Sequence, residues 1–125
     1  MENFYHNRDK LVDIFDRSGN KLWTIKEKLK KIDKDLNDKS IPKRQKQNLI
    51  KEFENLEKKI SDIQTRLKKE IEINMSKDIF QKIKQNSYVK RSENWYLMAL
   101  KEVEKKKNDV NDTICIANDN FEIQV

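Results

Sequence analysis

Residues 11–36 read LVDIFDRSGNKLWTIKEKLKKIDKDL, and this stretch decides the fold class. Its apolar side chains recur at alternating steps of four and three residues, with Ser18 as the one polar member of the series: Leu11, Phe15, Leu22, Ile25, Leu29, Ile32 and Leu36. Steps of this size bring the side chains to one narrow face of an α-helix. The sequence therefore predicts an amphipathic helix from about Phe4 to Asp38, packed along that face against a partner helix. Gly19 is interpreted as a tolerated interior glycine, with a kink or a close helix approach as the alternatives.

A second helix is predicted from about Lys43 to Ile73. Pro42 follows a polar run and suits the first turn of a helix. The apolar stripe of this helix consists of Leu49, Phe53, Leu56, Ile60, Ile63, Leu67 and Ile71. Its last step is four residues where a strict heptad requires three, which favours a short packed bundle over a long coiled coil.

A third long helix is predicted from about Ser87 to Asp109, after a short turn at 78–83 that Ser76 would cap. Its stripe consists of Val89, Tyr96, Leu100, Val103 and Val110, broadened by Trp95 and Ala99. Beyond Val110, two short apolar runs flank the turn-forming residues 118–120. This pattern predicts a β-hairpin tail or a linker over residues 111–125.

Together these segments predict an all-α protein. We expect residues 1–110 to form an elongated antiparallel three-helix bundle of long amphipathic helices, followed by the short extended or hairpin tail. The longest helix would span roughly 50 Å at about 1.5 Å per residue.

Composition excludes the enzyme classes that are recognised by glycine-rich or Cys/His sequence motifs. The 125 residues include one Gly, one Cys and one His, and 40% of them are charged. One glycine excludes a P-loop and a Rossmann fingerprint, and one Cys with one His cannot build a zinc site within one chain. No carboxylate pair lies in an apolar context that would suit it to acid–base catalysis. We therefore predict no catalytic residue, no cofactor and no metal, and a protein that is not an enzyme.

Cysteine use and hydropathy indicate where the chain works. A lone Cys115 cannot form an internal disulfide, which favours a reducing, intracellular compartment. No signal-peptide pattern is present at the N-terminus. The longest apolar run is residues 95–100, far short of the ~20 residues of a membrane span.

The net charge of +6 leaves two interpretations open. Basic residues are densest between Lys43 and Lys69, where they could follow the phosphates of a nucleic acid. The same run also suits a solvated helix face with interleaved Lys and Glu. Its one aromatic residue, Phe53, belongs to the apolar stripe, so no aromatic side chain interleaves the basic residues for base stacking, and we rank nucleic-acid binding below protein binding.

Arg91 and Trp95 are the candidate partner-binding residues. They lie one helical turn apart, and Trp and Arg are enriched where interfaces concentrate their binding energy. The competing interpretation is that Trp95 and Trp23 are wide core fillers between helices and that Arg91 is solvated.

The order and lengths of the predicted helices resemble the N-terminal domain of the syntaxin-six class of SNARE proteins, a three-helix bundle that precedes the SNARE motif. Three stretches carry the resemblance, which covers residues 4–110: Phe4-Tyr5 with Leu22-Trp23, the run from Leu49 to Ile63, and Arg91-Ser92-Glu93-Asn94-Trp95-Tyr96 leading into Val103. No SNARE heptad region and no membrane anchor follow Val110. The resemblance therefore implies a fragment that ends in the linker, or a chain without the fusion machinery.

The leading functional hypothesis is a non-catalytic protein-interaction domain. The resemblance implies a regulatory bundle in endosome or Golgi vesicle traffic, on the cytoplasmic face of those membranes, with SNARE proteins or tethering factors as helical partners. The alternative is a structural scaffold that homodimerises as a coiled coil through the seams of the first two helices. A basic, helical nucleic-acid-binding protein is the further alternative.

Overall fold

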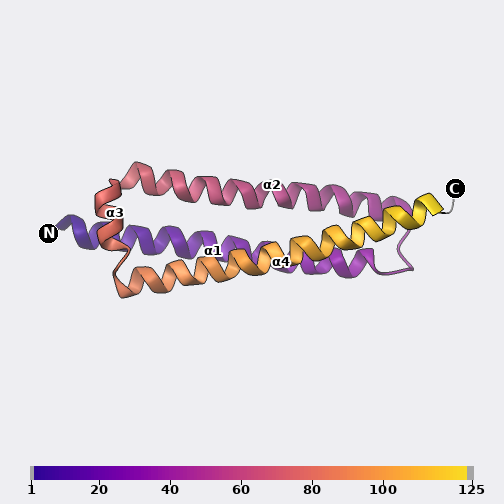
Figure 1. Cartoon of the computed structure of the whole chain (residues 1–125), viewed down its shortest axis with the longest axis horizontal. Coiled ribbons are helices and arrows are strands. Elements are labelled where there is room, and N and C mark those ends of the chain that lie inside the picture. The colour runs from indigo at the N-terminus through magenta and orange to yellow at the C-terminus, as the bar shows by residue number, and fades with distance from the viewer. Residues whose placement is uncertain (1, 124–125) are drawn as a thin grey trace.

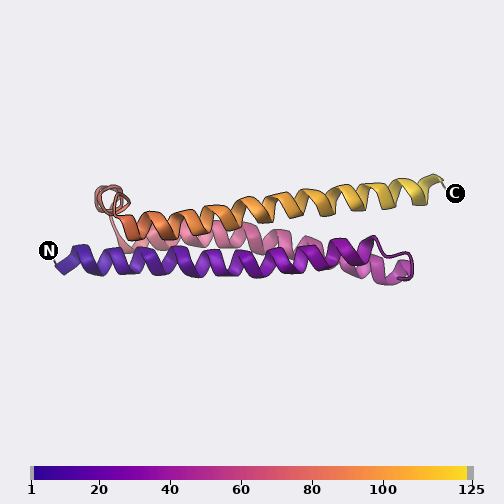
Figure 2. The same ribbon diagram turned by 90° about the horizontal axis from the view of Figure 1, so that it is seen from below.

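The computed structural model describes residues 2–123 and the side chains of residues 4–116. It is all-α over that range, and three long helices lie lengthwise while a short one crosses one end (Figure 1). Their bounds are α1 Glu2–Leu36, α2 Lys43–Asn74, α3 Lys77–Ile83 and α4 Ser87–Ile123. α2 runs opposite to α1 and α4, and the molecule is elongated in both views (Figures 1 and 2).

Helix α1 lies at the centre of the packing. It contacts both α2 and α4, and its interface with α4 is the more extensive. Every apolar member of the predicted stripe is buried, from Leu11 to Leu36, and Ile14 joins them. The predicted helix and its packing face are therefore confirmed.

Small side chains let α1 and α4 approach closely. Ser92 and Ala99 of α4 are buried, and Gly19 of α1 is buried beside Trp95. A Cβ atom on Gly19 would lie 2.6 Å from Cδ1 of Trp95 and 3.4 Å from the Cα of Tyr96. The interpretation of Gly19 as a merely tolerated glycine is therefore wrong, because the absence of a side chain makes room for the indole.

Helix α2 buries less of its apolar stripe than α1 does. Only three of its stripe residues are fully buried, and four others are half-buried: Phe53, Leu56 and Ile60 in the first group, and Leu49, Ile63, Leu67 and Ile71 in the second. The reason is that α2 packs along α1 and makes few close backbone approaches to α4. Part of the apolar face of α2 consequently remains accessible.

Side-chain hydrogen bonds mark the starts of α3 and α4. The Ser76 hydroxyl accepts a hydrogen bond from the Ile79 amide at 3.3 Å, as the predicted N-cap requires. The Asn86 side chain accepts one from the Tyr88 amide at 2.9 Å. Between α1 and α2, the Asp38 carboxylate accepts hydrogen bonds from the hydroxyl and the amide of Ser40, and these lower its pKa.

The expected β-hairpin or linker at the C-terminus is wrong. α4 continues to Ile123, and no strand occurs within residues 2–123. Ile114 follows Val110 by one helical turn and packs against the core, so the helix gains tertiary contacts by continuing. The Thr113 hydroxyl also donates a hydrogen bond to the Asp33 carboxylate of α1 at 2.7 Å. Gln124 and Val125, the end of the expected hairpin, lie outside the described residues.

This correction predicts the effect of a proline at position 112. Asp112→Pro should remove a backbone hydrogen bond and clash with the preceding turn, which ends the helix there. We expect the helical circular-dichroism signal to fall by roughly a tenth, because the rest of α4 loses its helical support. Asp112→Ala is the control and should leave the signal unchanged. A hairpin or linker would accept proline with no loss of signal, so an unchanged spectrum contradicts the continuous helix.

Candidate functional site

Helix α4 presents a second row of side chains beside its buried stripe. Tyr88, Arg91, Trp95 and Met98 follow one another at steps of three, four and three residues. Tyr88, Trp95 and Met98 are 61%, 41% and 58% exposed, and Arg91 is also exposed. The structure thus places both candidate partner-binding residues, Arg91 and Trp95, on one accessible face.

This row forms one wall of a shallow groove of about 590 Å³ between α1 and α4. The α1 side contributes a half-buried valine, a carboxylate and an amide. We define the Trp95 surface as these residues together with the α4 row: Val12, Asp16, Asn20, Tyr88, Arg91, Trp95 and Met98. The surface therefore combines exposed apolar area with a few polar groups, as binding surfaces commonly do.

The indole of Trp95 is held in place from α1. Its Nε1 donates a hydrogen bond to Oδ1 of Asn20 at 3.2 Å. Its ring lies against the Trp23 ring at a centroid distance of 5.3 Å and an interplanar angle of 41°. Together with the space left by Gly19, these contacts fix the orientation of an exposed aromatic side chain.

Trp23 packs against the ring of Trp95 and is the more buried of the two residues. Trp23 is half-buried, and its Nε1 is the one buried side-chain nitrogen or oxygen without a hydrogen-bond partner among the described residues. The Lys26 ammonium lies 4.8 Å from the Trp23 ring centroid and 3.4 Å from the Glu102 carboxylate. The core-filler interpretation thus describes Trp23 better than the more exposed Trp95.

An aromatic–cation cluster at the N-terminal end of α1 was not predicted from the sequence. The Arg8 guanidinium lies 5.0 Å from the Tyr5 ring centroid and 5.5 Å from that of Tyr88, and it pairs with Asp9 at 3.0 Å. Tyr88 belongs to the Trp95 surface, so the cluster extends that surface towards the start of α1. Tyr5 and Arg8 are three residues apart on one helix, but the sequence carries no signal for their contact with Tyr88, because that contact needs α1 and α4 to be parallel and in this register.

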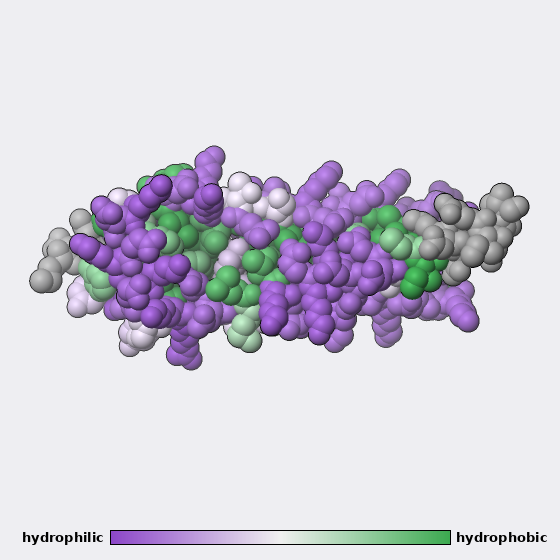
Figure 3. All heavy atoms as spheres, in the orientation of Figure 1, coloured by the Kyte–Doolittle hydropathy of each residue, from purple (hydrophilic) through white to green (hydrophobic). Residues whose placement is uncertain are grey.

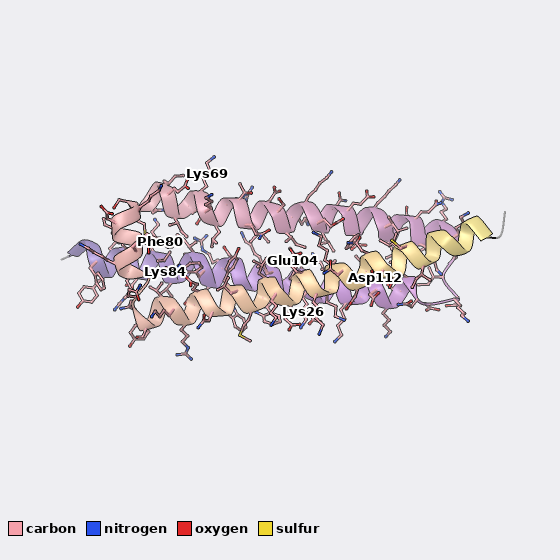
Figure 4. The ribbon with its side chains drawn as sticks, viewed as in Figure 1. Lys26, Lys69, Phe80, Lys84, Glu104 and Asp112 are labelled. Carbon is pink, nitrogen blue, oxygen red and sulfur yellow. The ribbon has the colours of Figure 1, made fainter. Side chains whose placement is uncertain are left out.

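A separate apolar hollow of about 530 Å³ lies where α2, α3 and α4 meet. Apolar side chains gather between α2 and α4 there (Figure 3). Phe80 and Lys84 lie at the α3 end, with the ammonium 5.7 Å from the ring centroid (Figure 4). The hollow reaches the ring of Tyr96, whose burial raises the pKa of its hydroxyl. The hollow lies between two helices that make few close backbone approaches to each other.

Nothing in the described part of the chain is arranged for metal binding or for crossing a membrane. No group of three or more His, Cys, Asp and Glu side chains there is placed to hold a metal ion. None of the helices described is both long and apolar enough to span a bilayer. His6 and Cys115 are both exposed.

The fold and the surface define an all-α protein of long amphipathic helices with a preorganised aromatic face. Comparison with protein families, with curated proteins and with solved structures finds no match to this chain.

Proposed function

We propose that the protein is a non-catalytic interaction module, and that its Trp95 surface binds an amphipathic helix of another protein. The observation that carries the proposal is the second row on α4, in which Tyr88, Trp95 and Met98 stay exposed beside a stripe that is buried except for the half-buried Leu100. Exposed apolar side chains gathered on one face are typical of binding surfaces. Tyr, Trp and Arg are also the residues that most often dominate binding energy.

The geometry of the row favours a helical partner. Steps of three and four residues match the spacing with which one helix receives the side chains of another. The row from Tyr88 to Met98 covers about three turns, or roughly 15 Å, which is enough for a short docked helix. Because Asn20 and Trp23 already orient Trp95, binding would order few additional side chains.

The sharper form of the proposal is the regulatory N-terminal bundle of a SNARE in endosome or Golgi traffic, on the cytoplasmic face of those membranes, with SNARE proteins or tethering factors as partners. It includes the antiparallel three-helix arrangement of α1, α2 and α4. Its support is the resemblance in helix order and length over residues 4–110. α4 runs past the end of that stretch, to Ile123.

The homodimeric coiled coil receives less support. It would use the seams of the first two helices, but the α1 seam is buried against other helices of the same chain. A second copy could instead occupy the Trp95 surface, and the solution mass distinguishes that case. Light scattering should give a mass near 15.1 kDa if the chain is a monomer.

The test places a photo-activatable cross-linking residue at position 98, on the Trp95 surface. A second chain carries it at position 58, on the exposed face of α2, as the control. We expect a cross-link from position 98 only, to a helical segment of a partner that can be purified. Trp95→Ala should then weaken binding of that partner at least about tenfold. Leu97→Ala removes an apolar side chain of similar exposure from another face of α4 and should have little effect.

Two results would overturn the proposal. One is a partner whose affinity is the same for the wild type and for Trp95→Ala. The other is a set of cross-links that is identical from positions 98 and 58. A mass of twice the monomer that returns to monomer in Trp95→Ala would assign the surface to a second copy of this chain.

A further inference from the structure

A different groove, between α1 and α2, is lined by more basic than acidic side chains. Its volume is about 400 Å³, and it uses other residues of α1 than the Trp95 surface does. Five of its lining side chains are basic and two are acidic: Arg17, Lys21 and Lys28 of α1, Lys59 and Arg66 of α2, and the carboxylates Asp62 and Glu70. The groove therefore has an excess of positive charge even for a chain of net charge +6.

Most of this charge is not neutralised within the chain. Arg17 pairs with Asp13 at 2.8 Å and with Glu70 at 3.4 Å, which uses one of the two lining carboxylates. The remaining four basic side chains make no ion pair with any described carboxylate: Lys21, Lys28, Lys59 and Arg66. Asp62 is the one lining carboxylate left to offset them. Four like charges gathered in one groove repel one another and attract an anionic ligand.

The lining between these cations is apolar. Ile14 and Ile25 of α1 are buried, whereas Ile63 and Leu67 of α2 are half-buried. The half-buried pair belongs to the part of the α2 stripe that remains partly exposed. A ligand that fits the groove must therefore present both apolar and anionic groups.

We propose that the α1–α2 groove binds an acidic amphipathic helix of a partner protein. The apolar side chains of that helix would cover Ile63 and Leu67. Its carboxylates would pair with the four uncommitted cations on both sides. The lining residues of α1 between Arg17 and Lys28 cover about three turns, or roughly 16 Å, so a partner segment of three to four turns fills the groove. Complementary charge would also accelerate the encounter.

A protein helix fits this groove better than a nucleic acid does. No aromatic side chain lines the groove, so bases would find no stacking platform. Phosphates would gain nothing from the apolar lining. The proposal does not depend on the Trp95 surface, because the two sites share no residue.

The test titrates the full chain into a fluorescently labelled synthetic helix with a leucine stripe and glutamate flanks, and follows the anisotropy. The same helix with lysine flanks is the probe control and should not bind. The double variant Lys21→Glu/Arg66→Glu should weaken binding of the glutamate helix at least tenfold. The double variant Lys90→Glu/Lys101→Glu carries the same charge change on exposed residues of α4 and should stay within twofold of the wild type.

The same experiment checks that the variants fold and that the groove acts independently of the Trp95 surface. Both double variants should keep the helical circular-dichroism spectrum, because all four replaced side chains are exposed. Trp95→Ala should leave binding of the glutamate helix unchanged, which separates this site from the proposed function.

Three outcomes would overturn the proposal. The first is a wild-type chain that does not bind the glutamate helix. The second is an equal loss of binding in the two double variants, which would assign the effect to overall charge. The third is a short DNA duplex or an anionic phospholipid vesicle that displaces the helix and itself binds more tightly, which would assign the groove to that ligand class.

Discussion

Phe53→Ala should lower the free energy of unfolding by about 3–5 kcal/mol. Phe53 is 2% exposed and is one of three α2 side chains that are fully buried against α1. Removing its ring loses the hydrophobic transfer energy and leaves a cavity in the interface. The loss should be near the upper end of core substitutions, because few other side chains of α2 are fully buried.

Urea denaturation followed by circular dichroism measures this loss. Ile73→Ala is the matched control, because Ile73 lies on the same helix and is 72% exposed, and it should change the free energy by less than about 0.5 kcal/mol. A loss below about 1 kcal/mol for Phe53→Ala would mean that α2 does not pack on α1 in solution as described. It would also remove the basis of the α1–α2 groove.

Gly19→Leu should lower the free energy of unfolding by roughly 1–3 kcal/mol, the usual range for overpacking. A Cβ atom at this position already lies 2.6 Å from Cδ1 and 2.9 Å from Nε1 of Trp95, so a leucine must displace the indole. The displaced indole should also lose its hydrogen bond to Asn20. Both effects change the position of the indole on the Trp95 surface.

Two measurements report this change: urea denaturation, and tryptophan emission, which should shift to longer wavelength as the indole becomes more exposed. Gly19→Ala should have a smaller net effect, since one methyl group gains about 1 kcal/mol of helix propensity against the same clash. Thr24→Leu adds a leucine at an exposed position of α1 and should leave both readouts near the wild type. Equal stability for Gly19→Leu and Thr24→Leu would contradict the close α1–α4 approach.

The predicted helices agree with the structure wherever the apolar period is unbroken. The α1 stripe is buried throughout, and α2 begins at Lys43 as expected from Pro42. The prediction failed after Val110, where Asn and Asp suggested turns and the short apolar runs suggested strands. Local preferences of that size are outweighed when a residue such as Ile114 gains core contacts by extending the helix.

The candidate site was predictable only in part. Helical spacing singled out Arg91 and Trp95, and the structure places both on one groove. The spacing did not reveal that Arg8 and Tyr5 meet Tyr88, because Tyr88 is about eighty positions from both in sequence. The basic α1–α2 groove was likewise hidden within a charge run that could equally have been a solvated face.

The sequence by itself determined the all-α class, the three long amphipathic segments and the absence of any recognised catalytic motif. These depend on composition and on a periodicity that is local to each helix. Only the tertiary structure decided that Gly19 leaves room for Trp95, that α4 exposes a second aromatic row, and that Lys21 and Arg66 share a groove. Those features depend on which faces meet and in what register, and that choice is made by the packing of all the helices together.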